Sequence, residues 1–355
     1  MKIAIDIGPI SEKNTSGHKV RGVGSYITSL KDGLARHDKN NTYTFFSRRK
    51  DIPRDIDLVH YPYFEPFFLS LPLFKKAKTV VTVHDLTPII FPKDFPVGIK
   101  GFLKWQIQKR ALRNVDAIIT DSNASKKDIV TLLGIPDEKV SVVYLAANNI
   151  FRKIAVSKEE KNKLLKKYNL PEKFGLYVGD ATANKNLPRL IDAIIDSNVP
   201  LVMVGKALSE TAPHTNPWNR DLVIVQKKIK NNPLFFPIGF VSNEDLILLY
   251  NYATFLIMPS FYEGFGLPIL EAMKCGCPVI TTKKGSIPEV AGDSAFYVDA
   301  YNVANVSEGI RKVFDSENIR QELSKKGFVQ ASKFSWEEAA EGTIRVYEAC
   351  MKNDK

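Results

Sequence analysis

The chain has 355 residues, 44% of them hydrophobic and 25% charged, so it is long enough for two domains and apolar enough to fill a core in each. Lysine and arginine outnumber aspartate and glutamate 50 to 39, and the net charge of +11 favours an anionic partner such as nucleic acid, a membrane surface or a phosphorylated small molecule. The three cysteines exclude a disulfide framework, and no apolar run reaches the ~20 residues that a membrane-spanning helix needs.

Strand-like and helical patterns alternate along the first half of the chain. A glycine-led segment at 22–37 has helical spacing and separates the first two strand-like runs. Such alternation is typical of a parallel sheet with helices on both faces. The expected strands are residues 2–8, 42–47, 57–62, 78–86 and 116–122.

A polar, lysine-rich segment at 152–173 interrupts this alternation, and we interpret it as a connector between domains. A second alternating series follows it. Helices are expected at 187–195, 244–253 and 266–276, and the strand-like runs are 174–180, 199–206, 222–229, 234–240, 255–260, 278–282 and 294–299. The chain is therefore expected to be an α/β protein built from two Rossmann-like domains.

The domain limits follow from these patterns. We place the N-terminal domain at residues 1–170 and the C-terminal domain at residues 171–334. Residues 335–355 carry apolar side chains at helical spacing, and Ser335 with Glu338 has the spacing of a capping box. We expect this closing helix to pack back toward the N-terminal domain.

The stretch PSFYEGFGLPILEAMKCGCPVITT, residues 259–282, is the main candidate site. Its glycines, Gly264 and Gly266, occupy a turn from a strand to a helix, at the sheet edge where doubly wound proteins bind ligands. Such a turn brings bare backbone and helix N–H groups to a diphosphate or a sugar, and Glu263 and Glu271 can accept hydrogen bonds from sugar hydroxyls. A simple turn with acidic residues favoured by the helix dipole has the same pattern.

The same stretch carries a family resemblance. E-G-F-G-L-P-I-L-E-A-M, followed by G-x-P-V-I-T and then G-S-I-P-E-V-A-G-D-S-A, resembles the E-x7-E signature of retaining glycosyltransferases of family 4. These enzymes have the GT-B architecture of two facing Rossmann domains. The resemblance extends over most of the chain, and the HDLTP and KNL forms are most similar to mannosyltransferase-type members. It also runs through GVGSYITSL, VVTVHDLTP, ITDSNASKKDI, YVGDATANKNLPRLIDAI and IGFVSNEDLILLY.

The resemblance implies a role for each matching residue. Glu263 would contact the hydroxyls of the donor sugar, Glu271 would hold the nucleotide ribose, and Lys185 would neutralise the diphosphate. His84, at the end of a VVTV strand, would lie beside the transferred sugar. The remaining donor-binding residues would be Gly22 and Gly24 near the donor phosphate, Phe240 and Val241 near the base, and Gly264, Phe265, Gly266 and Leu267 through their backbone groups.

One departure from the family pattern concerns the diphosphate. Family members often pair the lysine with an arginine, either five residues earlier or immediately before it, where this chain has Asp180 and Asn184. Lys206 or Arg189 could supply the missing charge, although Arg189 falls within a predicted helix, where an exposed surface position without a role in binding is the alternative.

Other patterns are better explained by structure than by chemistry. Asp55 and Asp57 form a D-x-D that precedes a strand, whereas the metal-binding signature of the other glycosyltransferase architecture follows one. Cys275 and Cys277 lack further zinc ligands and are interpreted as core residues. No acidic residue ends the run at 42–47, so NAD is not expected. We predict transfer without a metal or a cofactor.

Two basic, aromatic stretches, residues 64–76 and 98–114, are candidates for the acceptor side. They could rest on anionic lipid headgroups beside a lipid-linked acceptor, or they could be a core-packed helix with a solvated basic face. No nucleic-acid-binding motif accompanies them. With few cysteines and no signal-peptide pattern, we expect a cytoplasmic protein, with peripheral contact at the inner membrane face as an option.

These observations together predict a retaining, metal-independent transferase. It would move a hexose, with mannose favoured, from a nucleotide diphosphate sugar to a glycan or lipid-linked acceptor, as in polysaccharide biosynthesis. Two alternatives remain open. The chain could bind nucleotide sugars without catalysis, or it could be a nucleotide-sugar epimerase of similar architecture.

Overall fold

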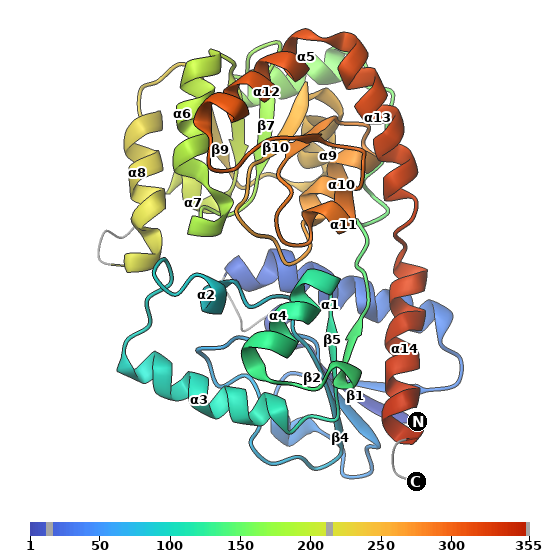
Figure 1. The fold of residues 1–355 in the computed structure, drawn as a ribbon. Coiled ribbons are helices and arrows are strands. Elements are labelled where there is room, and N and C mark those ends of the chain that lie inside the picture. The colour runs from blue at the N-terminus through green and yellow to red at the C-terminus, as the bar shows by residue number, and fades with distance from the viewer. Residues whose placement is uncertain (12–16, 211–215, 353–355) are drawn as a thin grey trace. The chain divides into compact units, whose positions relative to one another are not determined.

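A computed structural model describes residues 1–11, 17–210 and 216–352 of the chain (Figure 1). These residues form two compact α/β units, each built on one six-stranded parallel sheet. Unit 1 comprises residues 1–92, 97–146 and 334–355, and unit 2 comprises residues 93–96 and 147–333. The expected α/β class with two Rossmann-like units is confirmed.

The sheet of unit 1 has the order β2-β1-β3-β4-β5-β6, with all neighbours parallel. Its strands are β1 Lys2–Asp6, β2 Thr42–Phe46, β3 Leu58–Tyr61, β4 Lys78–Thr82, β5 Ala117–Thr120 and β6 Val140–Val142. The helices are α1 Gly17–His37, α2 Thr87–Ile90, α3 Ile99–Arg113, α4 Asn123–Leu133 and α14 Trp336–Lys352. The strand β6 was not predicted, because three residues are too few to show a pattern.

The sheet of unit 2 has the order β12-β11-β10-β7-β8-β9, also parallel. Its strands are β7 Gly175–Val178, β8 Leu201–Val204, β9 Phe235–Gly239, β10 Phe255–Met258, β11 Val279–Thr281 and β12 Phe296–Tyr297. Its helices are α5 Lys158–Tyr168, α6 Leu187–Ser197, α7 Lys206–Ser209, α8 Arg220–Ile229, α9 Asn243–Tyr252, α10 Leu267–Lys274, α11 Ile287–Ala291, α12 Val303–Asp315 and α13 Glu317–Ala331. This is the doubly wound topology. Strands β7 to β9 are added in one direction across the sheet and β10 to β12 in the other, so the strand order reverses between β7 and β10.

The run 222–229 was predicted as a strand and lies in helix α8. Its apolar residues Leu222, Val225 and Ile229 are buried at helical spacing, while Lys227 is exposed. A short apolar run does not by itself distinguish a strand from a buried helix.

Two expectations about boundaries differ from the structure. Unit 2 begins at residue 147 rather than at 171, because α5, in the middle of the expected connector, packs against α9. Helix α1 begins at Gly17, so Gly22 and Gly24 lie inside it rather than at its start. Their backbone is helical, and a Cβ on Gly22 would meet nothing within 4 Å.

The last helix, α14, belongs to unit 1 and packs along α1 (Figure 1). Ser335 caps its start by accepting a hydrogen bond from the Glu338 amide at 3.0 Å. The hydroxyl of Tyr347, fully buried, lies 2.7 Å from Nδ1 of His60 on β3. None of the described helices combines the length and the apolar content needed to cross a membrane.

Candidate functional site

Two loops of unit 2 meet at the point where its strand order reverses. Lys185 lies in the loop after β7 and Glu263 in the loop after β10, and these strands are neighbours in the sheet. The ammonium of Lys185 lies 2.8 Å from Oε1 and 2.7 Å from Oε2 of Glu263. Two residues 78 positions apart in the sequence therefore form one ion pair at the edge where such folds bind ligands.

Asparagine side chains hold the two loops together. Asn184 donates from Nδ2 to the Tyr262 carbonyl at 3.0 Å, and its own carbonyl accepts from the Phe261 amide at 2.8 Å. Asn186 donates to the Pro259 carbonyl at 3.0 Å. Asn184 is buried and joins the loops, so the position where family members often carry an arginine is occupied by a structural residue.

Glu263 is only 6% exposed and is held from several sides. The Ser260 hydroxyl donates to its Oε1 at 2.6 Å, in addition to the two contacts from Lys185. A carboxylate with this many donors stays oriented without a ligand. Its charge also adds to burial in raising the pKa of Tyr177 well above its usual range.

A second turn supports the backbone around Glu263. The Ser286 hydroxyl donates to the carbonyls of Glu263 at 3.0 Å and Phe265 at 2.9 Å. Gly285 has φ +55°, and a Cβ there would lie 2.7 Å from the Glu263 carbonyl oxygen. Residues 285 and 286 therefore fix the site loop. Both residues belong to the motif G-S-I-P-E, for which the family resemblance predicts no role.

The turn after Glu263 leads directly into α10. Gly264, Phe265 and Gly266 are buried. Leu267 is the first residue of the helix and Pro268 is the second. Gly266 has φ +98°, a left-handed conformation that glycine adopts without strain. Backbone groups of this turn and the start of α10 thus lie beside the Lys185–Glu263 pair, as the strand-to-helix turn predicted.

Glu271 lies on α10, the helix that follows the turn after Glu263. The hydroxyl of Tyr250 on α9 donates to its Oε2 at 2.8 Å. Tyr250 is fully buried, and burial together with Glu271 raises its pKa well above the usual range, so it remains a donor. The carboxylate is thereby held half-buried on the helix.

The other unit 2 candidates follow strands at the same edge. Lys206 begins α7 after β8 and is exposed, with its ammonium 3.7 Å from Glu210. Phe240 follows β9 and is 65% exposed, whereas Val241 beside it is buried. Since β10, β7, β8 and β9 are consecutive in the sheet, the predicted residues of unit 2 gather along one carboxyl edge.

In unit 1, His84 follows β4 and contacts a residue that sequence reasoning missed. Its Nδ1 lies 2.7 Å from Oδ2 of Asp121, a buried aspartate after the neighbouring strand β5. Burial opposes protonation of His84, but the Asp121 carboxylate, together with Asp85 and a hydrogen bond to the Pro62 backbone, outweighs it and raises the histidine pKa. The ring of Tyr26 packs edge-on against His84 with centroids 4.7 Å apart. The signal for Asp121 was the D-S-N-A-S motif after β5.

Residues interpreted as structural have structural partners. Asp57 accepts a hydrogen bond from the Lys2 amide at 2.7 Å, and Asp55 pairs with the Lys2 ammonium. Cys275 and Cys277 are buried free thiols. Across the described ranges, no group of three or more histidine, cysteine, aspartate or glutamate residues is placed to hold a metal ion.

Comparison with known proteins adds to this geometry. Residues 157–330 match the sequence family described as glycosyl transferases group 1, and residues 35–149 match the one described as Glycosyltransferase Family 4. The O-antigen chain mannosyltransferase B of Escherichia coli is 30% identical over 300 residues, which cover 82% of this chain and 75% of that protein.

Two further matches show the range of relatives. The serotype-specific mannosyltransferase WbdA of Escherichia coli is 29% identical over 286 residues, which cover 78% of this chain but only 34% of the much longer relative. Among solved structures, Anabaena Alr3699/HepE in complex with UDP and glucose aligns with a TM-score of 0.70 at 16% identity, covering 98% of this chain and 100% of that one.

Proposed function

The chain belongs to the glycosyl transferases group 1 family, and from this we propose that it moves a mannosyl residue from a nucleotide diphosphate sugar to a glycan or lipid-linked acceptor, with retention at the anomeric carbon. It is a glycosyltransferase, and its fold class is GT-B. The mannosyl group is supported by the relatives named mannosyltransferases, and the nucleotide sugar by a structural neighbour that holds UDP and glucose.

The observation that carries this proposal is the Lys185–Glu263 ion pair beside the turn that leads into α10. It combines a cation for a diphosphate, a carboxylate for sugar hydroxyls and the N-terminal turn of a helix in one place. We propose that a bound donor draws the Lys185 ammonium toward its phosphates, while Ser260 keeps the Glu263 carboxylate oriented toward the sugar.

The reaction then needs no covalent intermediate on the protein. The bond from the anomeric carbon to the diphosphate oxygen breaks, and the acceptor oxygen forms its bond on the same face. The acceptor proton passes to the leaving diphosphate, which acts as the base. Negative charge grows on the diphosphate as the bond breaks, so Lys185 and backbone N–H groups stabilise the transition state more than the ground state.

A second cation is proposed in place of the family arginine. Arg189 lies over the ring of Phe261, with its guanidinium carbon 5.3 Å from the ring centroid, and contacts Asn186. Lys206 is exposed and follows β8, which is adjacent to β7. We propose that Lys206 supplies the second positive charge and that two lysines serve where a metal ion neutralises the diphosphate in other enzymes.

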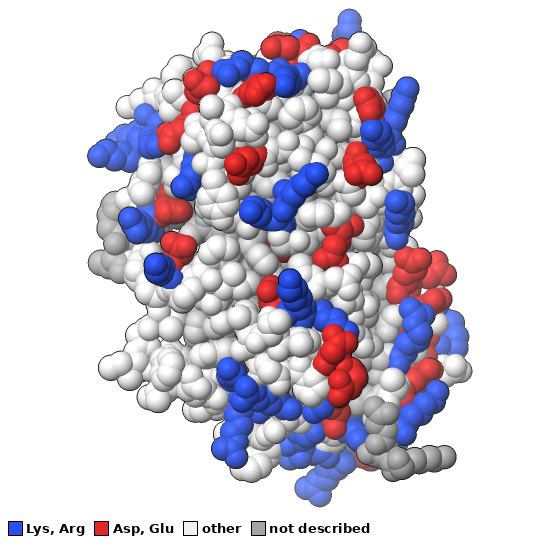
Figure 2. All heavy atoms as spheres, viewed as in Figure 1, with Lys and Arg blue, Asp and Glu red and all other residues white. Residues whose placement is uncertain are grey.

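A surface on unit 1 is proposed to contact the membrane. We call it the apolar face: Phe68, Leu69, Leu73, Phe74, Ile99, Phe102 and Leu103. Phe74 is 88% and Ile99 82% exposed, while Ala111 and Leu112, in the second half of α3, are buried. Figure 2 shows uncharged atoms over the first turns of α3 on a surface that otherwise mixes basic and acidic side chains.

Charge complementarity favours an anionic bilayer as the partner of this face. Lys75, Lys76, Lys100 and Lys104 are exposed and adjacent in sequence to its residues, and the Lys104 ammonium lies over the Phe68 ring, which suits the interface between acyl chains and acidic headgroups. The other interpretation of residues 98–114, a helix packed against the core with a solvated basic face, applies only to the second half of α3. We propose a cytoplasmic enzyme that meets a lipid-linked acceptor at the inner membrane face.

The test of the transfer function is a product assay with GDP-mannose, UDP-glucose and ADP-glucose and a lipid-linked or glycan acceptor. We expect a mannosylated product whose new linkage keeps the anomeric configuration of the donor, measured by NMR. Binding of nucleotide sugar without any turnover would favour the noncatalytic alternative. Conversion of the donor sugar without an acceptor would favour the epimerase.

A further inference from the structure

Unit 2 has a pocket at the edge of its sheet opposite to the candidate site around Lys185 and Glu263. Thr254, Pro278 and Lys173 line this pocket and lie just before β10, β11 and β7, at the amino ends of three neighbouring strands. Lys185 and Glu263 follow the carboxyl ends of β7 and β10. The two sites are therefore separated by the length of the sheet.

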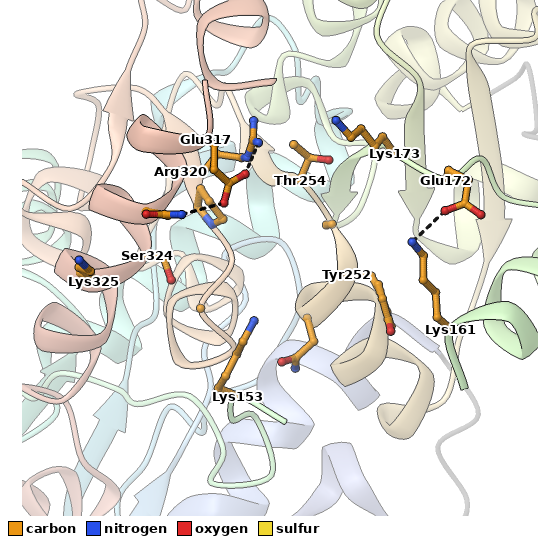
Figure 3. A pocket seen from close by; sticks show the side chains of 15 residues that line it. Lys153, Lys161, Glu172, Lys173, Tyr252, Thr254, Glu317, Arg320, Ser324 and Lys325 are labelled. Atoms are coloured by element: carbon orange, nitrogen blue, oxygen red, sulfur yellow. Dashed lines mark hydrogen bonds and ion pairs between the residues drawn. The ribbon is translucent and has the colours of Figure 1, made fainter. Parts of the chain in front are cut away.

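The pocket has a volume of about 490 Å³, which falls within the range of small-molecule sites, roughly 300–1,000 Å³. Its walls come from α5, α9 and α13 and from the loops before β7 and β11 (Figure 3). Unlike most such sites, its lining is charged and polar. Five of the lining residues are basic and two are acidic.

Both acidic residues are neutralised within the pocket. Glu172 pairs with Lys161 at 2.8 Å, and Glu317 pairs with Arg320 and also accepts from Gln321. Arg320 is further occupied by the carbonyl of Val313 at 2.9 Å. Three basic residues remain. Lys153, Lys173 and Lys325 form no ion pair within 4.0 Å among the described residues, although, besides Arg320 and Gln321, the charge of Lys173 helps to lower the pKa of Glu317.

The geometry brings these charges together with hydrogen-bond donors. Figure 3 shows Lys153 and Lys173 at different margins of the pocket, with the Lys153 side chain pointing toward its middle. The hydroxyls of Thr254 and Ser324 line the same space, and neither has a hydrogen-bond partner among the described residues. Ammonium groups and hydroxyls in this combination suit phosphate oxygens.

Helix dipoles do not account for this cluster. Lysine is favoured in the last turn of a helix, but Lys153 and Lys173 lie in loops and Lys325 lies in the middle of α13. Their side chains come from three parts of the chain that are distant in sequence, and only the tertiary structure gathers them.

We propose that this pocket binds a small molecule with a diphosphate or another multiply charged phosphate group, separately from the sugar donor. The net charge of its lining matches an anion with two or more negative charges. Such a ligand would lie against the last residues of α9 and the turn after α10, the helix that carries Glu271.

Calorimetric titration of the full chain with inorganic pyrophosphate tests this proposal. The pocket variant is Lys153→Ala with Lys173→Ala. The control variant is Lys227→Ala with Lys230→Ala, which removes the same charge from exposed positions on and just after α8. A Lys185→Ala background weakens binding of the probe at the donor site and so separates the two events.

In that background we expect one binding event, which the pocket variant weakens roughly three- to tenfold and the control variant leaves unchanged. Mannosyl transfer by the pocket variant with wild-type Lys185 should be unaffected. Equal pyrophosphate affinity in the pocket and control variants would overturn the proposal, as would loss of all binding in the Lys185→Ala background.

Discussion

At the scale of single residues, two pairs of charged groups have partners that lie far apart in sequence. Lys185 with Glu263 and His84 with Asp121 both join loops that follow neighbouring parallel strands. A carboxylate beside a cation in a half-buried site is oriented before any ligand arrives. Substitutions in these two pairs can therefore test the role of each residue.

Replacing Lys185 with alanine should reduce mannosyl transfer by about 10²–10³-fold, because one donor to the leaving diphosphate is lost. It should also lower the free energy of unfolding by about 1–3 kcal/mol, since the buried Glu263 carboxylate then loses its hydrogen bonds from the Lys185 ammonium. Denaturant titration and initial rates measure the two effects. The double variant Lys185→Ala, Glu263→Gln should recover stability but not transfer, and recovered transfer would refute the role of Lys185.

Replacing Glu271 with alanine should weaken nucleotide affinity by roughly ten- to a hundredfold if the carboxylate holds the ribose. Tyr250→Phe is the matched variant, because it removes the 2.8 Å hydrogen bond to Glu271 but keeps the carboxylate. We expect a smaller loss of affinity for that variant. Calorimetry with the preferred nucleotide measures both, and unchanged affinity in Glu271→Ala would contradict the ribose role.

The Asp121→Asn variant should lower the pKa of His84, because burial is then opposed only by the weaker effects of Asp85 and the hydrogen bond to Pro62. A raised folded pKa contributes stability that is present below about pH 6.5 and lost as pH rises through the folded value. The wild-type advantage in unfolding free energy over Asp121→Asn should therefore be larger at pH 6 than at pH 9.

The titration of His60 changes the free energy of unfolding with pH in the opposite direction to that of His84. His60 serves as the internal reference. Burial lowers its pKa to about 3, so near pH 6 only the unfolded chain binds that proton. Burial is the larger cause of this shift and is the same in wild type and Asp121→Asn, so most of the contribution cancels in the difference between them; the smaller cause is the charge of His84 itself. A difference that does not change between pH 6 and pH 9 would show that Asp121 does not govern the charge of His84.

At the scale of elements, the site depends on three turns that follow strands β7, β10 and β11. The turns at 182–186, 259–266 and 284–286 are joined by side-chain hydrogen bonds from Asn184, Asn186 and Ser286. None of these bonds lies within a regular helix or strand. The local sequence marks each turn, but the contacts between turns arise only when the strands pair.

The variant Gly285→Ala tests whether the turn at 284–286 holds the loop that carries Glu263 in place. The new Cβ would lie 2.7 Å from the Glu263 carbonyl oxygen at a residue with φ +55°, so the site loop must shift. We expect a loss of about 1–3 kcal/mol in unfolding free energy together with weaker donor binding. Gly98→Ala, where a Cβ meets nothing within 4 Å, is the control and should change neither. Normal donor affinity in Gly285→Ala would contradict the proposed support.

At the scale of the whole molecule, exposed apolar and charged surfaces indicate what the protein meets besides its donor. The apolar face of unit 1 exposes several large side chains that a water-facing surface seldom gathers. The pocket of unit 2 that Lys153, Lys173 and Lys325 line, here called the basic pocket, is polar and belongs to the other unit. We therefore assign the two surfaces to different partners.

Phe74→Ser with Ile99→Ser should reduce binding to vesicles that contain acidic lipids, measured by co-sedimentation, while the free energy of unfolding stays within about 0.5 kcal/mol. Val329→Ser on α13 is the control, because Val329 is 64% exposed and lies outside the apolar face. Transfer to a water-soluble acceptor should be retained. Equal vesicle binding by all three proteins would end the membrane proposal.

The sequence by itself determined the class of fold, most of the strands and the stretch that carries Glu263 and Glu271. Alternating patterns and a strand-to-helix turn are local properties, so they can be recognised without coordinates. It did not reveal the helix at 220–229, the position of Gly22 and Gly24 inside α1, or the unit boundary at 147, because each depends on packing with distant residues.

Only the tertiary structure decided which residues act together. Pairing of β7 with β10 and of β4 with β5 brings Lys185 to Glu263 and Asp121 to His84, and no spacing along the chain predicts either contact. The same is true of the three lysines around the basic pocket. Hydrogen bonds and ion pairs act over a few ångströms, whereas the partners are tens of residues apart, so folding must supply the neighbourhood in which they act.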